Sequence, residues 1–150
     1  MKNIFNEDVA QQIVARIENL SAVSIPIWGT MSASQMLAHC CVAYEMVYSE
    51  GYPRPNRFTR WVLKTFVKKM VISEKPYPKN GKTARPFLIK DDRNFEHEKG
   101  RLIVFINQTQ QLGKAEFEGK ASPSFGNLTA AEWSCLFYKH LDHHLTQFGV

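Results

Sequence analysis

Two segments of this sequence begin with a pattern that marks the start of a helix. Ser32-Ala33-Ser34-Gln35 and Thr129-Ala130-Ala131-Glu132 each place a hydroxyl residue three positions before Gln or Glu, and apolar residues at helical spacing follow. In such a capping box the two side chains satisfy backbone N–H groups at the helix N-terminus. The pattern predicts one helix from Ser32 to about Ser49 and another from Thr129 almost to the C-terminus.

Two further segments are amphipathic with a period of 3.6 residues. The first is Asn6–Leu20, with its first residue as N-cap, and the second begins after Asp91 or Asp92 and ends at Gly113. The apolar run Leu102–Ile106 is also compatible with a short strand, because an unbroken apolar run does not distinguish the period of a helix from that of a strand. The length of the whole segment favours a helix.

A long crossover with an extra helix separates the second and third of these segments. Gly51, Pro53 and Pro55 end the preceding helix, Pro76 and Pro78 follow the extra one, and Lys79–Ile89 is polar and irregular. We expect the residues that recur with helical period in between to pack against the rest of the protein; they are Phe58, Trp61, Val62, Thr65, Phe66 and Met70.

The second and last helices should bury most of their apolar side chains. In the second helix the expected stripe is Met36, Cys40, Ala43, Tyr44 and Val47, with His39 and Met46 at its flank. In the last helix it is Trp133, Leu136, Phe137, His140, Leu141, His144 and Phe148.

Four long amphipathic helices, with the extra helix in the crossover between the second and third, predict an all-α four-helix bundle. A length of 150 residues suits one domain, which we expect to span residues 1–150. The three cysteines, two of them adjacent, exclude a disulfide framework. Acidic residues near the start and the lack of a run of about 18 apolar residues favour a cytoplasmic protein without a membrane partner. Bundles often pair, so a homodimer is expected.

The histidines carry the chemistry that the sequence predicts. His140 and His144 lie one turn apart on the last helix, about 6 Å along its axis, so both imidazoles can reach one ion. Both belong to the apolar stripe, where a buried imidazole needs a partner for its nitrogens. His39 is the natural third ligand if the second and last helices are neighbours. Alternatively, the histidines are core residues hydrogen-bonded to backbone or water.

Three neutral imidazoles around an ion leave a position for water or substrate, whereas structural zinc sites are usually closed by a fourth protein ligand. A triad of this kind therefore predicts a reactive site.

The last helix contains His140-Leu141-Asp142-His143-His144-Leu145-Thr146-Gln147, which resembles the H-x-x-H-H-x-x-Q ending of the DinB/YfiT-like metalloenzyme superfamily. The residues Trp28, Met31, Gln35, Met36, Leu37 and His39 look like the segment that holds the first ligand of that superfamily. Residues 122–129 with Glu132 and Trp133 are similar to the stretch before the final helix in one of its uncharacterised families. The resemblance is loose from Gly51 to Arg93 and departs at Ser122, where a histidine is expected.

The resemblance implies a four-helix bundle whose divalent metal, zinc or nickel, is held by His39, His140 and His144. It implies that His143 faces partly away from the ion and that Gln147 orients a ligand or the bound water. Members with known activity transfer low-molecular-weight thiols to electrophiles, which implies a small-molecule substrate. Hydrolysis would use the same three ligands, and the sequence does not separate the two reactions.

Two other sets of reactive groups lie near these histidines in the sequence. Asp142 points to the opposite side of its helix, and Glu45 is a remote candidate for a general base. Cys40 and Cys41 beside His39 suggest a Cys-His nucleophile or a further metal ligand. Neighbouring residues on a helix point about 100° apart, however, and buried cysteines are more often inert packing groups.

The crossover is strongly basic. Between Tyr52 and Lys90 there are eleven Lys and Arg residues and a single acid, Glu74, in a chain of net charge +5. The stretch from Arg54 to Lys90 can serve as an electrostatic footprint for nucleic acid, a membrane surface or an anionic substrate, or it is simply a solvated face. A net charge of +5 is modest for a nucleic-acid binder, so we do not expect nucleic acid. The alternative to an enzyme is a non-catalytic bundle with structural histidines and a basic surface for an anionic partner.

Overall fold

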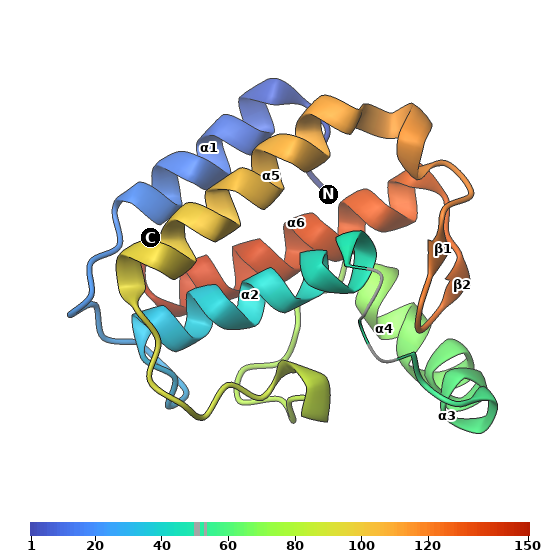
Figure 1. The fold of residues 1–150 in the computed structure, drawn as a ribbon, viewed down its shortest axis with the longest axis horizontal. Coiled ribbons are helices and arrows are strands. Elements are labelled where there is room, and N and C mark those ends of the chain that lie inside the picture. The colour runs from blue at the N-terminus through green and yellow to red at the C-terminus, as the bar shows by residue number, and fades with distance from the viewer. Residues whose placement is uncertain (50–51, 53) are drawn as a thin grey trace.

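The computed structural model describes residues 1–49, 52 and 54–150, and it is mostly helical (Figure 1). The long helices are α1 (Glu7–Glu18), α2 (Ala33–Tyr48), α5 (Phe95–Phe117) and α6 (Ala130–Gln147). Shorter elements are α3 (Arg57–Val62), the π-helical turn η1 (Leu63–Val67), α4 (Lys68–Ile72), the 3-10 turn η2 (Arg85–Phe87), β1 (Ala121–Ser122) and β2 (Gly126–Asn127). The expected helical class is confirmed, and each predicted long helix is present.

Side-chain caps mark the starts of α2, α5 and α6, whereas Asn6 stands at the predicted N-cap position of α1 without a side-chain capping bond. Both predicted capping boxes are confirmed, because Ser32 and Thr129 each accept a hydrogen bond from the third helical residue, whose side chain bonds back to the cap. The start predicted for the third long helix is wrong by two or three residues, since Asn94 caps α5 by accepting from the His97 N–H. Several polar residues before α5 could serve as its N-cap, and the backbone geometry of the loop determines which one does.

Helix α5 passes through Leu102–Ile106, so the strand alternative for that run is wrong. It also continues beyond its predicted end at Gly113, which has φ 69° and ψ −179°, to Phe117. Glycine adopts these angles readily, so the residue makes a kink between two helical stretches of α5. Figure 1 shows this change of direction near the end of α5.

The long helices pack against one another around a shared apolar core. Helix α2 contacts α5 and α6, and α1 contacts the same two helices. Tyr44 lies at the centre, with its ring stacked 5.7 Å from that of Phe105 and 4.5 Å from that of Phe137. Figure 1 shows α2, α5 and α6 running side by side. This arrangement places α2 next to the last helix, as the proposed triad requires.

Helix α2 is buried on almost every side from Ala33 to Tyr44. His39, predicted at the flank of the buried stripe, is itself buried, between α6 and η2. The crossover supplies the extra cover, which periodicity along α2 alone does not reveal. In the last helix the expected stripe is buried except for Leu136 and His140, which are partly exposed.

The crossover contains the predicted extra helix, built from α3, η1 and α4. Only its inner side, with Leu63, Val67 and Val71, packs on the core. The expectation that the whole apolar set packs is wrong, because the four largest side chains are exposed; they are Phe58, Trp61, Phe66 and Met70. A helix at the surface buries only one of its faces. This helix has apolar residues on two faces, so those on the second face are exposed to solvent.

A small hairpin of β1 and β2 leads into α6, where only a turn was predicted. The buried Ser122 hydroxyl accepts hydrogen bonds from the N–H groups of Ser124 and Phe125, so it organises this turn. Among the described residues, no helix combines the length and the apolar character needed to cross a bilayer.

Candidate metal centre

The three histidines singled out in the sequence lie together in the structure. His39 comes from α2, and His140 and His144 come from successive turns of α6. One ring nitrogen of each lies within 4.8 Å of those of the other two. The ring centroids are 4.5 Å apart for His39 and His144 and 4.9 Å apart for the other two pairs. Such a group can hold one metal ion.

A backbone carbonyl group of the crossover orients the His39 ring. Its Nδ1 lies 2.9 Å from the carbonyl oxygen of Phe87, which only accepts, so Nδ1 carries the proton. The lone pair of the neutral ring is then on Nε2, which faces Nε2 of His140 at 2.9 Å. Phe87 also packs its ring against both His39 and His140.

A side-chain amide orients His144. Its Nδ1–H donates to Oε1 of Gln147 at 2.8 Å, and Nε2 of Gln147 donates to the carbonyl of Trp28 at 2.6 Å. The amide is thus fixed at both ends, and the remaining nitrogen of His144 is free to bind. Gly29, at φ 82°, makes room for this contact, because a Cβ there would lie 2.5 Å from the Gln147 nitrogen.

Burial keeps these imidazoles neutral. It is the main cause that lowers the pKa of His39, with the Phe87 hydrogen bond acting in the opposite direction. Burial and then the neighbouring histidines lower the pKa of His140 well below 6.5, and the same causes lower that of His144 to about 3. Neutral imidazoles are the form that binds metal, so at neutral pH no proton has to leave these nitrogens.

The acids considered as general bases are engaged elsewhere. Asp142 forms a salt bridge with Arg16 at 2.6 Å on the side of α6 that faces α1. Glu45 pairs with Arg101, which also bonds Glu98. In the described part of the chain, the metal-binding group contains histidines and no carboxylate. A cation there would keep its full charge and would favour an anionic fourth ligand.

Aromatic residues surround the histidines. The ring of His143 lies 5.0 Å from that of His144, 5.8 Å from Trp28 and 5.7 Å from Tyr77. Sequence reasoning included His143, Gln147 and Trp28 but missed Phe87 and Tyr77. Both belong to the crossover, and Phe87 acts partly through its carbonyl, a group that every residue carries and that leaves no signal in the sequence.

The cysteines beside His39 do not have the surroundings of reactive thiols. The buried Cys40 Sγ lies 3.8 Å from the sulfur of Met36, and Cys41 Sγ lies 3.8 Å from the carbonyl of Glu98. Burial raises the pKa of Cys40 far above its usual value and that of Cys41 to about 12. Because the thiolate is the nucleophile, the Cys-His hypothesis is not supported.

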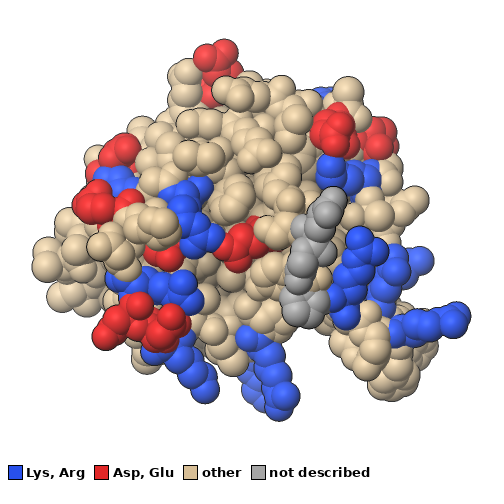
Figure 2. All heavy atoms as spheres, viewed as in Figure 1, with Lys and Arg blue, Asp and Glu red and all other residues tan. Residues whose placement is uncertain are grey.

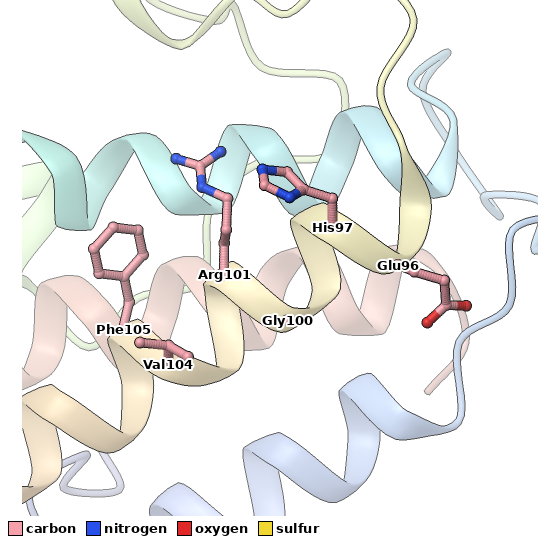
Figure 3. Close-up of a pocket in the computed structure, with 6 residues that line it drawn as sticks. All are labelled: Glu96, His97, Gly100, Arg101, Val104 and Phe105. Atoms are coloured by element: carbon pink, nitrogen blue, oxygen red, sulfur yellow. The ribbon is translucent and has the colours of Figure 1, made fainter.

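A shallow open groove lies elsewhere, along one face of α5 (Figure 3). Its residues are Glu96, His97, Gly100, Arg101, Val104 and Phe105. None of the clustered histidines lines it, and Arg101 is engaged with carboxylates of α2 and α5. The groove therefore adds no reactive group to the metal centre.

Comparison with known proteins places the chain in a family without assigning it an activity. No curated protein and no solved structure matches it. One family sequence model, described as "Protein of unknown function (DUF1569)", matches residues 5–149, nearly the whole chain. The chain belongs to this DUF1569 family of unknown function.

Proposed function

We propose that the protein is a metal-dependent enzyme that binds a divalent transition metal through His39, His140 and His144. The convergence of three neutral imidazoles from two helices, with no carboxylate in the group, carries this proposal. Imidazole suits zinc and nickel, and geometry rather than ligand type distinguishes them. Hydrogen bonds at Nδ1 already orient two of the three rings: the Phe87 carbonyl holds His39, and the Gln147 amide holds His144.

The proposed reaction is thiol transfer to, or hydrolysis of, a small electrophile. A metal in this site supplies Lewis acidity, which lowers the pKa of a thiol or water that it coordinates. The protein holds the three ligands in position, and Phe87, Trp28 and Tyr77 provide apolar surface around them. With Asp142 and Glu45 engaged in ion pairs, the described acids offer no general base beside the histidines.

The DinB/YfiT-like resemblance also belongs to this proposal. We infer a four-helix bundle of α1, α2, α5 and α6, which residues 1–150 form as one domain. The mutual contacts of these helices and the position of the histidines at α2 and α6 support this inference. The expected dimer and cytoplasmic location remain predictions.

Metal content is the direct test. Protein purified without a metal-affinity step is analysed for metals before and after incubation with zinc or nickel. We expect about one equivalent in the wild type and none in His140→Ala. His97→Ala, at an exposed histidine of α5, is the matched control and should keep the metal. Equal, metal-free spectra for all three proteins after incubation would exclude the metal site.

A second experiment separates the two reactions. Loss of a low-molecular-weight thiol in the presence of an electrophile is followed with a thiol reagent, and hydrolysis is followed without thiol. The protein's three cysteines are buried, which limits their own reaction with the reagent. Metal-dependent loss of thiol that disappears in His140→Ala supports transfer, whereas turnover without thiol supports hydrolysis.

The non-catalytic alternative is favoured by the 2.9 Å contact between the Nε2 atoms of His39 and His140. The same distance fits an N–H···N hydrogen bond in a metal-free structural cluster. Nitrogen NMR of the histidines distinguishes the two cases, because addition of zinc shifts the bound nitrogens of all three residues only if they share an ion.

A further inference from the structure

The helix of the crossover exposes its largest apolar side chains to solvent. Phe58 is 73% exposed, Phe66 69%, Trp61 57% and Met70 50%. Isolated exposed apolar residues are normal, but a contiguous group is a mark of an interaction surface. We name these four residues the aromatic face.

The π-helical turn η1 makes the aromatic face continuous. Phe58 and Trp61 are three residues apart, and their ring centroids are 6.2 Å apart. Trp61 and Phe66 are five residues apart, yet their rings also meet, edge to face, at 6.2 Å. Residues five apart do not face each other on an α-helix, whereas a π-turn with i→i+5 bonding brings them together. Such turns are frequent at functional sites.

Basic side chains flank the aromatic face. Arg57, Arg60, Lys64 and Lys69 are exposed, and within the described residues no carboxylate pairs with them. The one acid between Tyr52 and Lys90, Glu74, is paired with the N-terminal amino group. Figure 2 shows Lys and Arg gathered over the corner of the molecule where Figure 1 shows α3. The surface complements a negatively charged partner.

The other side of the same helix is fixed to the protein. The buried Lys139 of α6 donates to the carbonyl oxygens of Met70 at 2.6 Å and Ser73, at the end of α4. Lys68 forms a salt bridge with Glu132 of α6 at 3.0 Å. These contacts hold the aromatic face outward, so it cannot turn inward and bury its side chains without breaking them.

We propose that the aromatic face docks on an anionic lipid bilayer, with its apolar side chains in the interface and the flanking Arg and Lys on lipid phosphates. Amphipathic helices with Trp and Phe on one side and basic residues beside them bind membranes in this way. This requires no spanning segment, so it revises the expectation that the protein has no membrane partner.

The observations favour lipid over the other anionic partners. Single-stranded nucleic acid binds by stacking bases on free aromatic faces in a basic groove, but here the rings pack on one another and Met70 offers no ring. A second copy of the chain would bring the same four exposed cations together, which like-charge repulsion disfavours. An anionic bilayer suits both the exposed apolar side chains and the flanking cations, because its interface accepts apolar groups and its surface carries negative charge.

The test is co-sedimentation of the whole protein with vesicles of phosphatidylglycerol and phosphatidylcholine, or of phosphatidylcholine alone. We expect binding to the anionic vesicles that weakens as salt is raised. Trp61→Gln with Phe66→Gln should abolish it, since glutamine keeps helix propensity and removes the apolar area. The matched control is Val104→Gln with Leu112→Gln, two exposed apolar residues of α5, which should bind like the wild type.

A second variant tests the charges. Arg57→Glu with Arg60→Glu should weaken anionic binding by about tenfold or more. Arg57 is in the first turn of α3, where acidic residues are favourable, and Arg60 is an exposed residue of a helix that continues into η1, so this change should not melt α3. The proposal is overturned if the wild type ignores anionic vesicles, or if the variants of the aromatic face bind as well as the control. It is also overturned if those variants lose binding to a single-stranded oligonucleotide or self-association instead. Vesicle binding is measured without reference to metal content, so failure of the membrane proposal can be distinguished from failure of the proposed metal-dependent function.

Discussion

Gln147 contacts no ion in the proposed site, but it sets the orientation of a residue that would. Its Oε1 accepts from Nδ1 of His144, while its own amide is held by the Trp28 carbonyl. Groups that orient a metal-bound histidine in this way typically contribute a factor of about 10 to 100 in metal affinity.

We therefore expect Gln147→Leu to fold and to bind zinc about 10- to 100-fold more weakly, measured by competition with a chelating dye. Gln11→Leu, at an exposed position of α1, is the control and should leave the affinity unchanged. Equal affinities for the two variants would mean that the Gln147 contact plays no part in binding.

The buried histidines also predict how stability depends on pH. Burial lowers the pKa of His39 and lowers that of His144 to about 3, whereas histidine in an unfolded chain titrates near 6.5. Below about pH 6.5 the unfolded chain takes up protons that the folded, metal-free protein does not. The contribution of these neutral histidines to the free energy of unfolding is therefore fully present above about pH 6.5, and it is lost as the pH falls toward their pKa values in the folded protein.

In the presence of a chelator, the titration of His144 should lower the free energy of unfolding by about 1.4 kcal/mol per pH unit between about pH 6 and pH 4. Urea titrations measure it. In His144→Leu the slope should be smaller by the contribution of one histidine, while Gln11→Leu, which changes no titratable group, should keep the wild-type slope. A wild-type slope retained in His144→Leu would contradict the assignment.

Within α5, two glycines have opposite roles. Gly113 adopts φ 69° and ψ −179°, a region that is essentially closed to other residues, and it makes the kink before Phe117. Gly100 lies inside the regular helix with no atom within 4 Å of the position of a Cβ. One glycine is required by the backbone, and the other only weakens the helix.

Gly113→Ala should lower the free energy of unfolding by about 1 to 3 kcal/mol, whereas Gly100→Ala should raise it by about 0.5 to 1 kcal/mol. Chemical denaturation of both variants measures the two changes. The same sign for both would show that the kink is not what Gly113 provides.

At the scale of the whole molecule, the histidine cluster joins helices that are about one hundred residues apart in the sequence. Metal bound there would bind only the folded protein and would stabilise it by about 4 kcal/mol at a thousand times Kd. For a chain of this length that raises Tm by about 8 to 16 °C. Thermal scans with and without zinc should show this rise in the wild type and none in His140→Ala. A rise in the variant would locate zinc at another site.

The sequence by itself determined the helices and the candidate ligands. A capping box joins residues three apart, and His140 and His144 are one turn apart, so both patterns act within one helix and can be read without knowing the fold. Only the tertiary structure decided that His39 is inside, that the Phe87 carbonyl orients it and that Trp61 and Phe66 stay exposed. Burial depends on which distant segment covers a face, and a carbonyl belongs to every residue, so neither leaves a pattern along the chain.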